Sequence, residues 1–247
     1  MQPKTRIDGV KSVVRKRSVL LPLLLAMILV GAGGGILAGR AAVADTGKSI
    51  GNVAKFSVDE NYFPTGKMGD VGDLSMSKQE GFIQFTYTAE GHGPHKWDYQ
   101  FVDGKENPDP AQFAGYMYLE PQNNWGTDPE GGYDLQECHH TLRWEARSAD
   151  GEVNVEFVVG GDKRRFDSLK PDEKTFPYPN SINKNLGAKH LTTQWQEFLV
   201  GLSSIPNERF KRIVGGFGWV ITWDANGVKA KQPKKFTIEI RNIRYEK

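Results

Sequence analysis

Charged and apolar residues alternate in two segments whose side chains are suited to bind hydroxyl groups. In TLRWEARS, residues 141–148, Arg143, Glu145 and Arg147 share one face of an expected strand. Glu156 takes the same kind of position in the next segment, EVNVEFVVGG. Guanidinium and carboxylate groups form paired hydrogen bonds, so these residues suit a polar groove for a hydroxyl-rich ligand. Cross-strand ion pairs on a solvated sheet face explain the same pattern, and both interpretations stand.

Aromatic residues supply the second requirement of such a ligand, which is a flat apolar surface. Tyr116 and Tyr118 alternate in FAGYMYLE and are predicted to form one wall of the groove. Trp219 lies in the glycine-rich GGFGWVITW, where either a ligand or another backbone can approach closely, and a core position for Trp219 is the favoured alternative. Trp125, in QNNWGTDPEGGYDL, either contacts the ligand from a loop or caps a structural corner.

Enzymatic chemistry has little support in the sequence. Glu145 and Glu156 would form a glycosidase-like acid/base pair if they faced each other on adjacent strands, but a row of paired surface residues is the simpler explanation. The segment HGPH places His92 and His95 close together, without a third metal ligand at a recognisable spacing. Neither a GxSxG nucleophile motif nor a phosphate-binding loop occurs in the sequence. A hydrolase or lyase is therefore the less favoured prediction.

Short β-strands are expected to position these residues. Seven segments are rich in β-branched and aromatic residues and are bounded by Gly, Pro, Asn or Asp. They are residues 81–90, 113–120, 140–148, 152–161, 193–202, 215–223 and 235–245. Only Ser203–Arg212 suggests a short helix or turn. The pattern predicts an all-β protein with an antiparallel β-sandwich, and it places Trp144 and Trp195 in the core.

The first 44 residues differ from the rest of the chain. Residues 1–17 form a basic region, and residues 18–39 carry no charge. The AVA at Ala42–Ala44 fits a signal-peptidase site, so residues 18–44 read as a signal peptide or a membrane anchor. Cleavage would release an exported protein, whereas an uncleaved segment 18–39 would hold the chain in the membrane. Both alternatives predict an extracytoplasmic domain, periplasmic, secreted or anchored, at residues 45–247.

The net charge of the chain, +2, belongs to this first segment. Residues 1–44 contain seven of the 32 basic residues and one of the 30 acidic residues, which leaves 25 against 29, or −4. The remainder therefore has no basic excess that would indicate nucleic-acid binding. Cys138 is the only cysteine, so the domain must be stabilised by its apolar core rather than by a disulfide.

Several segments together resemble a known class of domain. They are NNWGTDPEGGYDL, LTTQWQEFLVGL, IVGGFGWVI and the closing FTIEIRNIRYE. In this order they resemble the galactose-binding-like, jelly-roll β-sandwich domains that serve as non-catalytic carbohydrate-binding modules in bacteria. The resemblance extends over residues 53–246. It implies a glycan or polysaccharide as the partner and a groove that uses Tyr116, Tyr118, Trp125, Arg143, Glu145, Arg147, Glu156 and Trp219.

The resemblance also implies a structural calcium ion, with Asp59, Glu60 and Glu239 as its ligands. The chain departs from the family pattern here, because it has Glu239 and Asn242 where related domains often carry an acidic pair. Residues 161–190 form a long insertion between two expected strands, which is typical of a functional or disordered loop.

The sequence therefore predicts an exported, non-catalytic module that recognises a polysaccharide or an envelope glycan. The alternative is a protein-binding scaffold or assembly factor at the cell envelope, because this fold also carries protein-binding functions. A scaffold would expose an apolar patch in place of a groove lined by aromatic and charged residues.

Overall fold

The computed structural model describes residues 46–70, 73–89, 101–102, 105–106, 112–160, 182–229 and 233–247. All of them belong to one compact unit, Ala41–Lys247. The expected signal or anchor segment, residues 161–181 of the long insertion, and the pair His92 and His95 lie outside the described residues. Within the described ranges, no helix has the length and the apolar character needed to span a bilayer.

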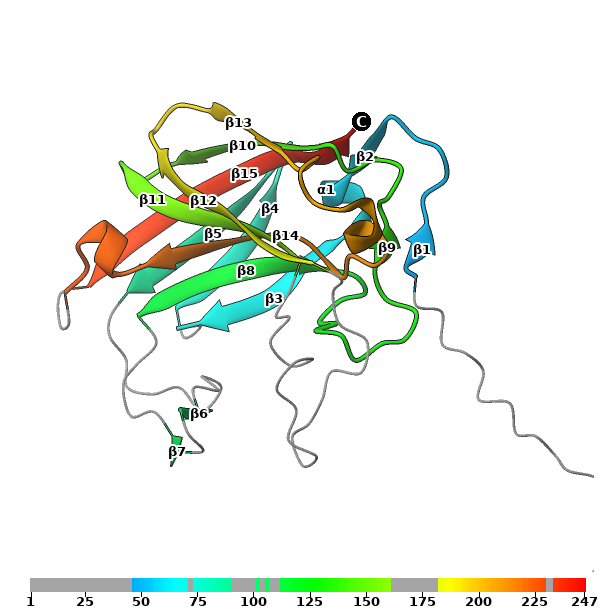
Figure 1. Cartoon of the computed structure of the whole chain (residues 1–247). Helices are drawn as coiled ribbons and strands as arrows, with labels where there is room; N and C mark the ends of the chain where they lie inside the picture. Colours follow the sequence, from blue (N-terminus) through cyan, green and yellow to red (C-terminus); the bar gives the residue numbers. More distant parts are fainter. Residues whose placement is uncertain are drawn as a thin grey trace, which may run out of the picture. The chain divides into compact units, whose positions relative to one another are not determined.

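Two antiparallel sheets stack face to face and confirm the predicted β-sandwich (Figure 1). We call the first the β15 sheet. Its order is β13-β10-β15-β5-β4, and β2 also pairs with β15. Its strands are β2 (Lys55–Ser57), β4 (Leu74–Gln79), β5 (Phe82–Ala89), β10 (Thr141–Ser148), β13 (Gln196–Gly201) and β15 (Lys234–Glu246).

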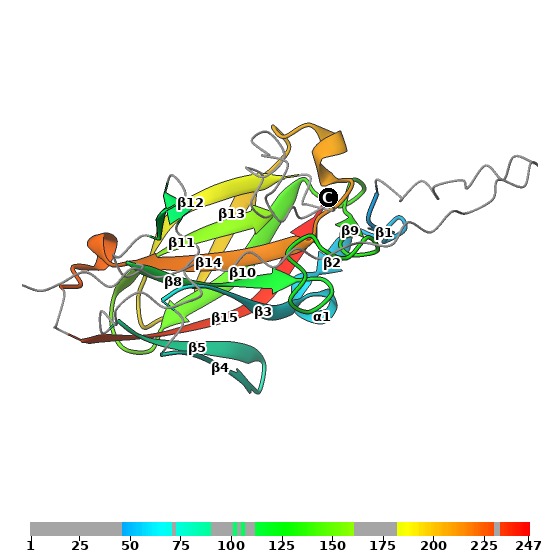
Figure 2. The same cartoon turned by 90° about the horizontal axis from the view of Figure 1, so that it is seen from below.

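The second layer, which we call the β14 sheet, lies in front in Figure 2. Its strand order is β12-β11-β14-β8-β3. Its strands are β3 (Phe63–Gly69), β8 (Phe113–Leu119), β11 (Val153–Gly160), β12 (Asn183–Leu191) and β14 (Gly215–Thr222). Two pairs of short strands also occur among the described residues. The strand β1 (Lys48–Ser49) pairs in parallel with β9 (Tyr133–Asp134), and β6 (Phe101–Val102) pairs antiparallel with β7 (Lys105–Glu106). The short helices are α1 (Val58–Asn61), η1 (Asn207–Phe210) and η2 (Asp224–Asn226).

The core between the sheets consists largely of aromatic rings that alternate along the strands as predicted. Trp144 on β10 lies 4.9 Å from Phe157 and 5.5 Å from Phe217 between ring centroids, and both of those residues come from the β14 sheet. Trp144, Phe157 and Phe217 are fully buried. Because side chains alternate across a strand, burial of Trp144 turns Arg143 and Glu145 to the outer face of the β15 sheet.

The strand β15 is continuous, but the strands that pair with its edge are not. Residues Lys234–Ile240 pair with β5, and residues Arg244–Glu246 pair with β2. Between them, the register to β10 shifts, and Asn242 adopts a positive φ of 55°. This is a β-bulge, a feature that bends a strand and redirects its side chains. It leaves a gap in the edge of the sheet.

Helix α1 closes part of this gap. Ser57 and Glu60 have the spacing of a capping box, and the Ser57 hydroxyl accepts a hydrogen bond from the Glu60 backbone N–H. The short helix presents Asp59, whose carboxylate accepts the backbone N–H of Ile243 at 2.8 Å. The Asp59 side chain thus accepts the backbone hydrogen bond of β15 that a neighbouring strand would otherwise accept at this point.

Candidate functional site

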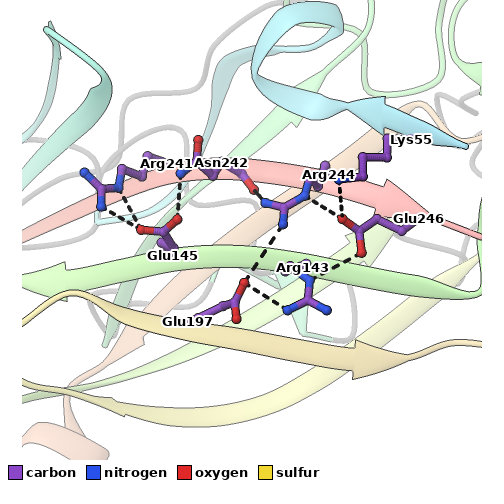
Figure 3. A network of polar contacts seen from close by, with 8 residues as sticks. All are labelled: Lys55, Arg143, Glu145, Glu197, Arg241, Asn242, Arg244 and Glu246. Atoms are coloured by element: carbon purple, nitrogen blue, oxygen red, sulfur yellow. Dashed lines mark hydrogen bonds and ion pairs between the residues drawn. The ribbon is translucent and has the colours of Figure 1, made fainter.

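The outer face of the β15 sheet carries a lattice of ion pairs (Figure 3). Arg143 bridges Glu197 on β13 at 2.9 Å and Glu246 on β15 at 3.3 Å. Arg244 donates to Glu246 at 2.7 Å, and Lys55 lies 3.7 Å from the same carboxylate. We call this surface the charged face and define it by Arg143, Glu145, Arg147, Glu197, Glu239, Arg241, Arg244 and Glu246.

Glu145 and Arg241 form the most directed pair on the charged face. The Nε and Nη2 groups of Arg241 donate to one Glu145 oxygen at 2.9 and 2.7 Å, and Asn242 Nδ2 donates to the other at 2.6 Å. Partial burial favours a higher pKa for Glu145, but the hydrogen bonds from Asn242 and Arg241 outweigh it and hold the pKa below its usual range. The bulge therefore serves the site, because it brings Asn242 beside Glu145.

Glu239 forms the deepest part of the charged face. It is 4% exposed, and its two oxygens accept from Arg147 at 2.5 Å and from Gln84 at 2.9 Å. Because β10 pairs Arg147 with Glu239, this contact is a direct cross-strand pair.

Trp195 was predicted to be a core residue, and this prediction is wrong. It lies just before β13 at the level of Arg147, on the outward side, and it is only partly buried. The guanidinium of Arg241 lies 4.0 Å from its ring centroid, and that of Arg147 lies 4.8 Å away. The ring is thus held by two cations through cation–π contacts.

Phe82 adds a second aromatic ring to this surface. Its centroid lies 5.8 Å from that of Trp195, although β10 and β15 separate their strands in the sheet. Three strand spacings would place them about 14 Å apart on a flat sheet. The two side chains therefore reach toward each other across the charged face, and Arg241 lies beneath Trp195.

A cavity of about 390 Å³ opens beside this pair, at the gap in the sheet. Its walls include Phe82 and Arg241 together with Asp59, Lys78 and Asn242. The charged face and this cavity therefore share residues and form one continuous surface. Burial raises the pKa of Asp59 to about 6, although the backbone N–H groups of Ile243 and Asn242 act in the opposite direction.

The structure brings together three of the predicted ligand-binding residues, Arg143, Glu145 and Arg147. The aromatic partners predicted for them are not on the same surface. Tyr116, Tyr118 and Trp219 have exposures of 3%, 0% and 0% and lie in the core. Their assignment to a groove is corrected: β8 and β14 turn these side chains toward the β15 sheet, where Tyr116 and Trp219 pack on Phe85.

Glu156 also lies apart from the charged face. It belongs to β11 in the other sheet, and its carboxylate accepts a hydrogen bond from Asn185 on β12 at 2.9 Å. Because Val155 and Phe157 point into the core, Glu156 points away from it, on the opposite outer face from Glu145. The two carboxylates therefore do not form the acid/base pair that adjacent strands would have allowed.

The segment around Trp125 forms a structural corner. The Asn124 side-chain oxygen accepts from the backbone N–H groups of Gly126, Thr127 and Asp128, and its amide donates to the Glu120 carbonyl. Trp125 is partly buried and packs closely over Gly66, where an added Cβ would lie 2.8 Å from its ring. The structural corner, one of the two alternatives for this segment, is present. The other alternative, contact of Trp125 with a ligand, stays a prediction.

The predicted calcium ligands do not come together. Asp59 binds the backbone at the bulge, whereas Glu239 is occupied by Arg147 and Gln84. Among the residues that the structure describes, no three His, Cys, Asp or Glu side chains are arranged to hold a metal ion. The expectation of a site formed by Asp59, Glu60 and Glu239 is therefore corrected.

No protein-family model and no curated protein matches the sequence. Solved structures with a similar arrangement include a family 11 carbohydrate-binding module from Clostridium thermocellum in complex with a β-1,3-1,4-mixed-linked tetrasaccharide. It has 10% identity and a TM-score of 0.41, and the match covers 78% of this chain and 94% of that one. A family 30 carbohydrate-binding module has 11% identity and a TM-score of 0.40, with coverage of 78% and 98%. At such identities a similar fold does not define a ligand.

Proposed function

We propose that the protein binds a glycan through the charged face of the β15 sheet. The observation that supports this proposal best is the position of Trp195, a partly exposed ring held by Arg147 and Arg241 beside Phe82. Sugar recognition requires an aromatic surface for the apolar face of the ring and planar polar groups for its hydroxyls. Both lie here within one surface.

The polar groups retain hydrogen-bonding capacity after their mutual contacts are formed. Arg241 uses two of its N–H groups on Glu145, and a guanidinium has five. The contacts among the charged residues also fix their orientation before a ligand arrives, which lowers the entropy cost of binding. A solvated sheet face explains the ion pairs by themselves. It does not explain why Trp195 and Phe82 meet above them.

The first test is a glycan-array screen of the chain, followed by calorimetry with any glycan that binds. Trp195→Ala is expected to weaken binding at least about 10-fold, since loss of a central aromatic contact commonly costs about 1.4 kcal/mol or more. Trp125→Ala is the matched control, because Trp125 lies at a corner away from the charged face. Loss of binding in the Trp125 variant alone would place the site at the corner. If the folded chain binds no glycan, the proposal fails and a protein-binding scaffold becomes the better explanation.

We also propose that residues 45–247 function outside the cytoplasm. This rests on the basic region 1–17, the uncharged run 18–39 and the AVA at Ala42–Ala44. A fusion of residues 1–60 to a reporter that is active only after export tests the proposal. Mass spectrometry of the mature protein then distinguishes cleavage after Ala44 from retention of residues 18–39 as an anchor.

A further inference from the structure

A second cavity, of about 430 Å³, has none of the charged-face residues in its lining and is lined by two adjacent histidines. His139 and His140 precede β10 and form one wall. The lining is completed in part by the turn before η1, where Ser203 and Pro206 lie. This turn is fixed to the histidines, because the backbone N–H of Leu202 donates to the His140 carbonyl at 2.8 Å.

His139 is held in the state that a metal ligand requires. Its ring is 5% exposed and packs on Phe210, with centroids 4.2 Å apart. Its Nδ1 lies 2.9 Å from the Gln136 carbonyl oxygen, which can only accept, so Nδ1 carries the proton and Nε2 presents a lone pair. A backbone carbonyl on the second nitrogen is the common outer-shell partner of a metal-bound histidine.

The spacing of the two rings fits a shared ion. The centroids of His139 and His140 lie 5.1 Å apart, and the ring planes are inclined by 74°. Two imidazoles that bind one ion at about 2.1 Å with a tetrahedral angle have centroids about 5 Å apart. The cavity wall contains no Lys or Arg that would repel a cation, and its hydroxyl and amide groups suit coordinated water.

We propose that His139 and His140 form a binding site for a divalent transition-metal ion with a preference for imidazole ligands. Water or a Ser203 hydroxyl would complete the coordination shell, since the described residues contain no third His, Cys, Asp or Glu at this point. The site is independent of glycan binding at the charged face. It also differs from the calcium site considered above, which would use carboxylate ligands on another part of the fold.

The test is titration of the full chain with Cu²⁺, the ion that imidazole sites bind most tightly among the divalent first-row metals. Electron paramagnetic resonance of the bound ion is expected to show two coordinated nitrogens. His140→Ala should weaken binding at least about 10-fold and leave one nitrogen, and it affects only an exposed side chain. This readout does not depend on a His139 variant, which would disturb the buried contact with Phe210.

Two controls separate this site from the other histidines. His190→Ala removes an exposed histidine on β12 and should leave the affinity unchanged. The double variant His92→Ala with His95→Ala should also bind normally. If that variant loses the ion while His140→Ala retains it, the ion belongs to the HGPH segment and the proposal is overturned. Failure of the folded chain to bind Cu²⁺ overturns it as well.

Discussion

Asp59 accepts a hydrogen bond from the backbone N–H of Ile243 at 2.8 Å, across 184 residues of sequence. The other carboxylate oxygen is buried and has no hydrogen-bond partner within the described structure. Burial raises the pKa of Asp59 from 3.8 to about 6. Ionised Asp59 therefore destabilises the folded state, although its hydrogen bond closes the gap in the edge of the β15 sheet.

This shift predicts the pH dependence of stability. The raised pKa means that the folded state binds more protons than the unfolded chain between about pH 4 and pH 6, so stability falls as the pH rises through this window. Asp59→Asn retains an oxygen for the Ile243 N–H and removes the charge. It should stabilise the protein by up to about 3 kcal/mol at pH 7, less the cost of an unpaired amide N–H, and this gain should disappear as the pH falls toward about 3. Urea denaturation at several pH values measures this, and a pH-independent difference would contradict the prediction.

Two buried tyrosines should respond in opposite ways to loss of their hydroxyl groups. Tyr245 donates to the Gly216 carbonyl at 2.7 Å, whereas the Tyr118 hydroxyl has no hydrogen-bond partner among the described residues. Tyr245→Phe should lower the free energy of unfolding by about 1–2 kcal/mol, because it leaves a buried carbonyl unpaired. Tyr118→Phe should be neutral or stabilise by about 1 kcal/mol, since it removes an unpaired buried hydroxyl. Equal losses in both variants, measured by urea denaturation, would be inconsistent with this account.

The close contact between β8 and β14 depends on the absence of a side chain at Gly115. A Cβ there would lie 2.2 Å from the Trp219 carbonyl oxygen, a distance that requires the backbone to move. Gly115→Ala should therefore destabilise the protein by about 2 kcal/mol or more. Gly201→Ala is the matched control, because nothing lies within 4 Å of its added Cβ, and it should change stability by less than about 1 kcal/mol. Thermal unfolding distinguishes the two results.

The ion pairs of the charged face should differ in strength. Arg241 makes two short hydrogen bonds to Glu145 and stacks on Trp195, whereas Lys55 is 67% exposed and lies 3.7 Å from Glu246. Arg241→Ala should cost about 1–2 kcal/mol of stability, and Lys55→Ala less than about 0.5 kcal/mol. The loss in the Arg241 variant should persist at 0.5 M NaCl, since stacking and short hydrogen bonds are less sensitive to salt. If 0.5 M NaCl abolishes the loss of stability in the Arg241 variant, the contact behaves as a simple surface ion pair and this prediction is wrong.

Strands that have one buried face were predictable from the sequence. The alternation in residues 140–148 and 152–161 identified β10 and β11 and their inward residues, since the pleat gives side chains a period of two. The strands β3, β4 and β12 were missed. In β4 only Leu74 is buried, and β12 exposes most of its length, so neither carries an alternating apolar pattern. β12 therefore lay within what looked like one long insertion.

The candidate site was only half predictable, for a related reason. Periodicity placed Arg143, Glu145 and Arg147 on one face, but it gives no information on which sheet a strand joins. Consecutive strands β10 and β11 lie in different sheets, and so Glu156 is far from Glu145 in the fold. Trp195 precedes an apolar run and looked like its first core residue. Its register against Arg147 is set by the pairing of β13 with β10, a long-range contact that local sequence does not encode.

The position of β15 in its sheet also has a consequence for the order of events during synthesis. This strand joins β10 on one side to β5 and β2 on the other, yet among the strands that the structure describes it is the last to leave the ribosome. Until residues 234–246 emerge, the hairpin β4–β5 and the pair β10–β13 have no common neighbour. A nascent chain arrested before residue 234 is therefore expected to stay sensitive to protease.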